Sequence, residues 1–120
     1  MKYLLMIRSS TERWAAMTDQ ERRELGQGTL AVGRQLAAEG RQLDGGGLPD
    51  ESLSRVVRTG ADGEPVVTDG PYAEAKEHLA GFMVVECESE AAAIAIAAQL
   101  PDAEINSVDI RPIDETVWTP

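Results

Sequence analysis

Cysteine and histidine are nearly absent from this 120-residue sequence, occurring once each, as Cys87 and His78. A single cysteine excludes an internal disulfide and fits a reducing compartment. Zinc sites need three or four protein ligands, mostly Cys and His, so we expect no metal and no bound cofactor. Cys87 lies beside Val85 in a strand-like pattern, which favours a buried, inert thiol over a nucleophile.

Positive charge and long apolar runs are also scarce. The chain carries 11 Lys and Arg against 21 Asp and Glu, a net charge of −10. Because affinity for nucleic acids and anionic membranes comes largely from Lys and Arg, we expect neither as a partner. The apolar run Tyr3–Ile7 is too short for a signal peptide or a membrane span, so we expect a cytoplasmic protein.

Motifs with a defined reaction are absent as well. Glycines 45–47 lack the lysine and the strand-to-helix context of a phosphate-binding loop, and no Gly-x-Ser-x-Gly sequence occurs. The apolar share of 42% is ordinary for a globular protein, and 120 residues are enough for one core. We therefore expect a single domain over residues 1–120.

The apolar pattern predicts the order strand, helix, strand hairpin, strand, helix, strand. The continuous run Tyr3–Ile7 is typical of a central strand that is buried on both faces. Thr18 and Glu21 form a Ser/Thr-x-x-Glu capping box that starts a helix, and Gly40 ends this helix. The remaining predictions are a hairpin over 53–59 and 65–68, a strand over 81–87, a helix over 90–100 and an edge strand over 108–113. We interpret 9–17 and 42–50 as loops.

This order predicts an α+β sandwich, an antiparallel sheet with two helices on one face. The strands at 3–7 and 81–87 are apolar on both faces, so the face without helices would expose a large apolar patch. A second copy of the same sheet is the simplest cover, and we therefore expect a homodimer. The Ala- and Ile-rich helix at 90–100 must be either deeply buried or covered by another subunit.

Two features of the first half concern packing. Trp14 stands in polar surroundings, and it either plugs an edge of the core, which we favour, or lines a pocket or an interface. The helix at 19–39 places Leu25, Thr29, Val32 and Leu36 on one face but also contains glycines 26, 28 and 33, each of which costs up to about 1 kcal/mol relative to Ala. We expect close packing of the helix backbone on the sheet to offset this cost.

The segment 69–78 combines a rigid turn with a cluster of ionisable side chains. If Pro71 opens a short helical turn, Glu74, Glu77 and His78 share one face. Clustered carboxylates near Lys76 can separate acid and base roles, so the segment is a candidate site for proton transfer. The alternative is a solvated turn. His78, the sole imidazole, is the natural proton shuttle near neutral pH, with a structural role as its alternative.

A family resemblance rests on this segment. The sequence Asp69-Gly70-Pro71-Tyr72-x-Glu74-x-Lys76-Glu77, followed by Gly81-Phe82, resembles the signature of the DGPF family within the YCII-related proteins. The resemblance covers nearly the whole chain and implies a ferredoxin-like fold that dimerises into an α+β barrel with a pocket in each half.

The resemblance also guides the choice of site residues. Related proteins use a His–Asp pair with the His on the first helix, but 19–39 contains no histidine. Asp69 is therefore the candidate acid or base, and His78 is a second candidate. The motif implies ligand contacts by Gly70, Pro71, Tyr72, Glu74, Lys76 and Glu77.

Two functions of different classes follow. The first is a small cytosolic protein with a ligand or acid–base site at the 69–77 loop. The alternative is a non-catalytic regulatory or accessory protein, linked to an extracytoplasmic-function sigma factor system, because members of the family are often encoded beside such factors. Neither reading identifies a substrate.

Overall fold

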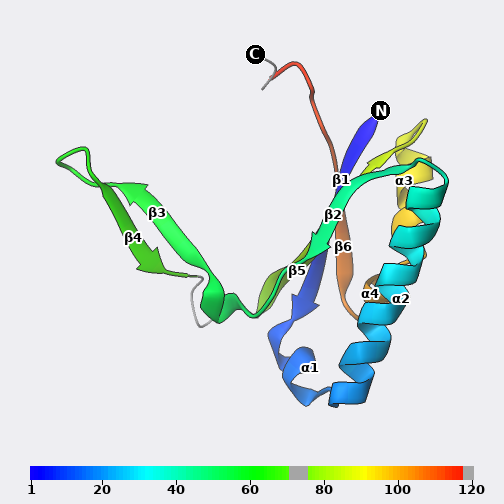
Figure 1. Cartoon of the computed structure of the whole chain (residues 1–120), viewed down its shortest axis with the longest axis horizontal. Helices are drawn as coiled ribbons and strands as arrows, with labels where there is room; N and C mark the ends of the chain where they lie inside the picture. Colours follow the sequence, from blue (N-terminus) through cyan, green and yellow to red (C-terminus); the bar gives the residue numbers. More distant parts are fainter. Residues whose placement is uncertain (71–75, 118–120) are drawn as a thin grey trace.

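The computed structural model describes residues 1–70 and 76–117 and has a four-stranded antiparallel sheet at its centre (Figure 1). The strand order is β2-β5-β1-β6. The bounds are β1 Lys2–Ser10, β2 Gln42–Gly47, β5 Glu77–Glu86 and β6 Ser107–Pro112. Together with helices α2 (Asp19–Ala38) and α3 (Glu90–Ala98), these strands follow the order βαββαβ, which is compatible with a ferredoxin-like fold. The predicted α+β class and the central position of the first strand are confirmed.

The two faces of the sheet differ in burial. Leu5 of β1 pairs with Met83 of β5 and with Ile110 of β6, and the side chains on this face pack under the helices. The core cluster comprises Tyr3, Leu5, Ile7, Leu36, Met83, Val85, Cys87, Ala93, Ile96, Ala97 and Leu100. The alternate residues of the two central strands point to the helix-free face and are only half-buried: Leu4, Met6, Phe82 and Val84. The buried thiol predicted for Cys87 is confirmed.

The two long helices begin where their caps predict. The Thr18 hydroxyl accepts a hydrogen bond from the Glu21 backbone N–H, and the Glu21 carboxylate accepts one from the Thr18 N–H, which completes the capping box of α2. Gly40, with φ of 71°, follows the end of this helix. The Ser89 hydroxyl caps α3. Only one side of α3 is buried, and Ile94 on its other side is exposed.

Both segments interpreted as loops contain regular structure. Residues 9–17 include a short helix, α1 (Thr11–Ala16), because the Ser10 hydroxyl accepts a hydrogen bond from the Arg13 N–H and caps it. Residues 42–50 include the edge strand β2, whose glycines pair with β5. A run of glycines has no alternation of apolar and polar side chains that would predict a strand. Residues 45–47 form one here because their backbone groups pair with β5. A short helix, α4 (Pro101–Ile105), follows α3.

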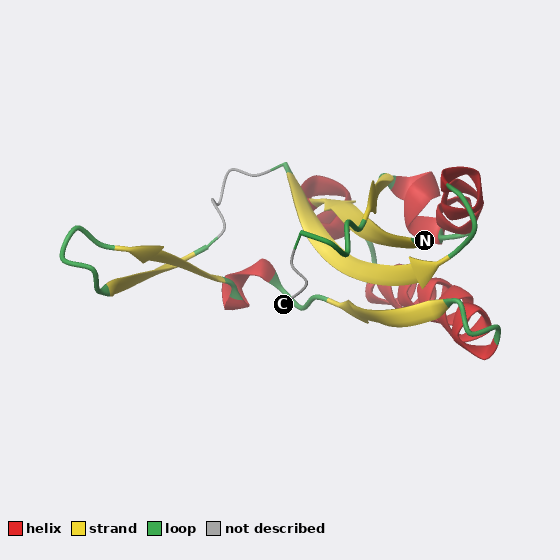
Figure 2. Ribbon diagram, turned by 90° about the horizontal axis from the view of Figure 1, so that it is seen from above, coloured by secondary structure: helices red, strands yellow, loops and turns green. Residues whose placement is uncertain are grey.

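The predicted hairpin is confirmed, but it stands apart from the main sheet. Strands β3 (Arg55–Thr59) and β4 (Pro65–Asp69) form a separate two-stranded sheet. It projects away from the body of the molecule in both views, inserted between β2 and β5 (Figures 1 and 2). Val57, Val66 and Val67 on this arm are exposed. No helix among the described residues is long and apolar enough to cross a membrane.

Candidate functional site

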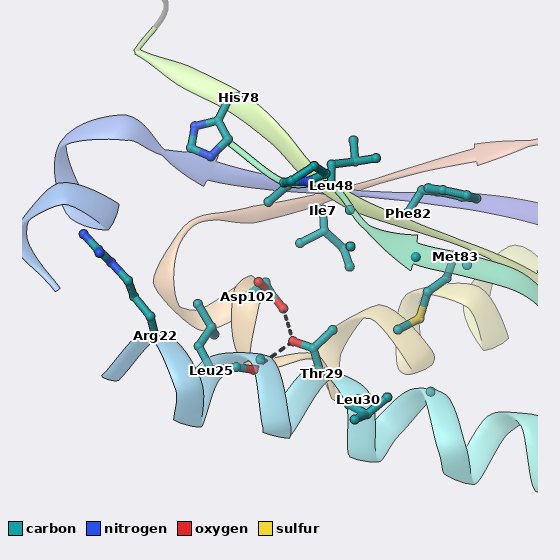
Figure 3. Close-up of a pocket in the computed structure, with 18 of the residues that line it drawn as sticks. Ile7, Arg22, Leu25, Thr29, Leu30, Leu48, His78, Phe82, Met83 and Asp102 are labelled. Carbon is teal, nitrogen blue, oxygen red and sulfur yellow. Dashed lines mark hydrogen bonds between the residues drawn. The ribbon is translucent and has the colours of Figure 1, made fainter. Parts of the chain in front are cut away.

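A large cavity lies between α2 and the β2–β5 edge of the sheet (Figure 3). Its volume is about 1360 Å³. The apolar wall between the sheet and α2 is formed mainly by Ile7, Leu25, Leu30 and Met83. The lining continues at the edge of the sheet with Leu48 and Phe82, and the Phe82 ring lies on the other side of β5 (Figure 3). A cavity of this kind, mostly apolar with a few polar groups, is the usual setting for a small organic ligand.

The cavity exists because only the second half of α2 packs on the core. Leu36 is buried in the core cluster, whereas Leu25 and Thr29 line the cavity. The expectation of close packing on the sheet holds at Gly33, where an added Cβ would lie 2.9 Å from Gln42 Oε1 of β2. At Gly28 the close neighbour is not the sheet but helix α4, since an added Cβ would lie 3.0 Å from Pro101 Cγ. The expectation is wrong at Gly26, which lines the cavity and has no neighbour within 4 Å of an added Cβ.

The single histidine lies at the end of the cavity where β5 begins. The Nδ1 atom of His78 is 3.4 Å from Glu51 Oε1 and 3.3 Å from Thr11 Oγ1. The side chains of His78 and Glu51 are 16% and 27% exposed, so water screens their attraction only in part. Three separate elements, β5, the 3-10 turn η1 (Glu51–Leu53) and α1, meet at this nitrogen.

Glu51 favours one of the two neutral tautomers of the ring. An ionised carboxylate can only accept hydrogen bonds, so Glu51, 3.4 Å from Nδ1, favours the tautomer of the neutral ring that carries its proton on Nδ1. The lone pair then lies on Nε2, which has no hydrogen-bond partner within residues 1–70 and 76–117. A carboxylate beside one ring nitrogen is the geometry in which a histidine can be held in position for proton transfer.

The turn that carries Glu51 is held by its own cap. The Asp50 side chain accepts a hydrogen bond of 2.9 Å from the Ser52 N–H. This bond, together with the nearby His78 ring, holds the pKa of Asp50 below its ordinary value. Asp50 is therefore a second carboxylate beside the imidazole, at the rim of the cavity.

A buried carboxyl group lies in the wall near α2. Asp102, in the first turn of α4, is 8% exposed, and its Oδ2 atom is 2.6 Å from Thr29 Oγ1 (Figure 3). The same hydroxyl is 3.1 Å from the Leu25 carbonyl oxygen. Since one hydroxyl has one proton, the shorter distance assigns it to the carboxylate.

Trp14 and Arg22 form one side of the cavity. The guanidinium of Arg22 lies 5.0 Å from the centre of the Trp14 ring and donates hydrogen bonds of 3.0 and 2.7 Å to the Trp14 carbonyl oxygen. This cation–π contact is attractive because the guanidinium is positively charged and the face of the indole ring is electron-rich. Trp14 thus lines a pocket, the alternative to core packing that the sequence left open.

Comparison with known proteins assigns the family. The family model described as YCII-related domain matches residues 1–117. The chain belongs to the YCII-related family. It is also 29% identical, over 115 residues, to an uncharacterized protein of Rhizobium meliloti (strain 1021), a match that covers 94% of this chain and 92% of that protein.

The residues of the site predicted for this YCII-related chain do not lie together in the structure. Gly70 and His78 line the large cavity. Lys76 and Glu77 line a smaller depression beside α1. The Asp69 side chain is 93% exposed, lies 3.6 Å from Arg55 in an ion pair on the arm, and is not part of the cavity wall.

The predicted contacts of Pro71, Tyr72 and Glu74 lie outside the described residues. The shared face proposed for Glu77 and His78 is wrong, because both lie in the extended strand β5, where neighbouring side chains point to opposite faces.

Sequence reasoning missed Glu51, Thr29 and Asp102. Glu51 and Asp102 stand among many acidic residues, and no spacing pattern links them to His78 or to Thr29. One local signal was available for Asp102, an acidic residue directly after Pro101 at the start of a helix. Among the described residues, no group of three or more His, Cys, Asp and Glu side chains is placed to hold a metal ion.

Proposed function

We propose that this YCII-related protein binds a small organic molecule in the cavity under α2 and catalyses proton transfer on it, with His78 as the acid–base group. One observation carries the proposal. The only imidazole of the chain lines a large, mainly apolar cavity, and a carboxylate lies beside its Nδ1 atom. We place this activity in the cytoplasm.

His78 would act through Nε2. Its lone pair accepts a proton from the bound molecule, and the imidazolium that forms is stabilised by Glu51 at Nδ1. The proton is then returned to the same molecule, either at the atom it left or at another. No electron transfer and no other reactant is required. Apolar walls strengthen the electrostatic interactions of such a pair because they exclude water.

The segment between Gly70 and Lys76 belongs to the proposal as a part of the binding site. Gly70 and His78 lie on either side of it in sequence, and both line the cavity. Ligand contacts by Pro71, Tyr72 and Glu74 remain a prediction on this basis, as does membership of the DGPF branch of the family. Asp69, exposed on the arm, remains a candidate acid or base only for a ligand that reaches the arm.

The test begins with a thermal-shift screen of small metabolites, since a ligand of the native state raises the melting temperature. Ligands that carry an acidic C–H bond are then incubated in deuterium oxide, and exchange of that hydrogen is followed by NMR. We expect His78→Gln to slow the exchange about a hundredfold or more, and Glu51→Gln to slow it less, because Glu51 acts through His78.

Binding is located by a substitution that fills the cavity. Gly26→Leu adds a side chain where no atom lies within 4 Å of the new Cβ, so it should block the ligand and leave the fold intact. Equal thermal shifts in the wild type and in Gly26→Leu would place the ligand elsewhere. Exchange that persists in His78→Gln would rule out the acid–base role. Recovery of a stoichiometric sigma-factor-system protein, without any small ligand, would favour the accessory function instead.

We also propose that the protein is a homodimer formed through the helix-free faces of two sheets. The support is the apolar centre of this face, made by Leu4, Met6, Phe82 and Val84, with Arg8 and Asp109 paired at 2.8 Å beside it. A two-fold axis would place the apolar centre of one copy against the apolar centre of the other, so both would be covered at once. The exposed valines of the arm add apolar surface that a second copy could cover.

A further inference from the structure

We propose that the ligand of this cavity carries a positively charged amino group, which binds to the carboxylate of Asp102. The inference rests on the proposed function in that it uses the same cavity, and it adds the chemical class of the ligand. It starts from the contacts of Asp102, which the proton-transfer mechanism does not use.

Asp102 is mostly buried and has few protein partners, although its carboxylate is not fully enclosed. Its side chain is 8% exposed, yet it appears in none of the ion pairs formed within residues 1–70 and 76–117. The one hydrogen bond recorded to its carboxylate comes from the Thr29 hydroxyl, at 2.6 Å. A carboxylate accepts about four hydrogen bonds, and a buried charge is costly unless it is paired. The group is therefore prepared for a further donor, preferably a cation.

The arginines of the cavity wall do not supply that cation. Arg22 points toward α1, away from Asp102 (Figure 3). Its guanidinium is already bound to the Trp14 carbonyl oxygen and lies 3.7 Å from Asp19 in an ion pair. Arg34 lines the cavity, but its side chain is exposed and is not paired with Asp102.

The net charge of the wall also favours a cation. The acidic residues of the wall are Asp44, Asp50, Glu51 and Asp102, and the arginines are Arg22 and Arg34. The wall therefore carries more negative than positive charge. An anionic ligand would be repelled by this excess, and an ammonium group would be attracted to it.

The apolar surroundings of Asp102 define the rest of the ligand. Leu25 and Ile7 lie near the carboxylate in Figure 3, and His78 lies on the opposite side of the cavity. A primary ammonium has three donors for Asp102, and an apolar body attached to it would extend past these side chains toward His78. The ligand class is thus an aliphatic or arylalkyl primary amine.

Three probes with the same aromatic body test this class: phenethylamine, phenethyl alcohol and phenylacetate. Binding of each to the full-length protein is measured by isothermal titration calorimetry. We expect the amine to bind about tenfold or more tightly than the alcohol, because a charge-assisted hydrogen bond replaces a neutral one, and phenylacetate to bind most weakly.

Asp102→Asn keeps the shape of the side chain and an oxygen for the Thr29 hydroxyl but removes the charge. In this variant we expect equal affinities for amine and alcohol, with the affinity for the alcohol unchanged. Glu104→Gln is the matched control, since it removes one charge from the same helix at an exposed position outside the cavity wall. This control should retain the full preference for the amine.

The outcomes separate this inference from the proposed function. Equal binding of amine and alcohol by the wild type would overturn the amine class, and the cavity would still be a binding site. A preference that survives Asp102→Asn would show that Asp102 is only a structural link between α2 and α4. Failure of all three probes would overturn the inference as well, while the metabolite screen with Gly26→Leu decides the proposed function separately.

Discussion

Gly70 is required by packing rather than by backbone conformation. Its φ is not positive, so a side chain would not be strained by the backbone. An added Cβ, however, would lie 2.5 Å from Val56 Cγ2, well inside van der Waals contact. The glycine of the Asp-Gly-Pro turn therefore lets the chain pass close to the base of the arm, next to the cavity that Gly70 lines.

A double substitution tests this explanation. Gly70→Ala should lower the free energy of unfolding by about 1–3 kcal/mol, the usual cost of overpacking. Val56→Ala removes the methyl group that the new Cβ would meet, so the double variant should recover most of this loss. Urea denaturation of the four proteins measures the coupling between the two positions. Additive losses would contradict the steric explanation.

At the same scale, the sequence could supply only half of the candidate site. His78 was visible as the only imidazole. Its partners were not, because Glu51 and Thr11 come from distant segments that meet only through the pairing of β1, β5 and the turn after β2. Asp102 was hidden for the same reason, since its partner Thr29 belongs to another helix.

The capping box of α2 gives this element a pH dependence. The Thr18 N–H donates a hydrogen bond of 2.9 Å to the Glu21 carboxylate, and this bond holds the pKa of Glu21 below its ordinary value. The folded state therefore gains stability from ionised Glu21 above the ordinary carboxyl pKa of about 4.3. This gain is lost as the pH falls through the lowered pKa of the folded state.

Thermal unfolding of wild type and Glu21→Gln between about pH 7 and pH 2 measures this effect. The wild type should be the more stable protein near neutral pH, and the difference in melting temperature should shrink in acid. Glu88→Gln, at an exposed position outside the helices, is the control and should show no such convergence. A constant difference for Glu21→Gln over the whole range would refute the role of its charge.

Elements with strong local signals were the ones the sequence predicted well. The apolar run of β1 and the caps Thr18 and Ser89 gave the correct strand and both long helices. The errors occurred in segments whose own sequence gives only a weak structural signal and whose conformation depends on the elements around them. Glycines 45–47 form a strand because β5 provides their hydrogen bonds, and α1 forms in a segment too short to show helical periodicity.

The helix-free face of the sheet, with its half-buried apolar side chains, leads to a prediction about the assembly of the whole molecule. Leu4 lies in the middle of the helix-free face and does not line the cavity. If two such faces meet, Leu4→Lys should place two charges in the apolar interface and shift the protein from dimer to monomer. Sedimentation equilibrium over a dilution series should show twice the chain mass of 12.9 kDa for the wild type.

The matched control is Ala31→Lys, at an exposed position of α2 that lies outside the cavity wall. It adds the same charge away from the proposed interface and should remain dimeric. A wild-type protein that is a compact monomer down to nanomolar concentration would show that the helix-free face needs no second copy.

The pairing of β1 with both β5 and β6 also determines when this sheet can be completed on the ribosome. β1 is synthesised first, but β6 lies near the other end of the described chain, and Val108 and Ile110 reach the core only with it. Until β6 emerges, one edge of β1 offers unpaired N–H and C=O groups, to which the strands of other nascent chains can pair. The four-stranded sheet is therefore completed only when β6 pairs with β1, after its other three strands have been made.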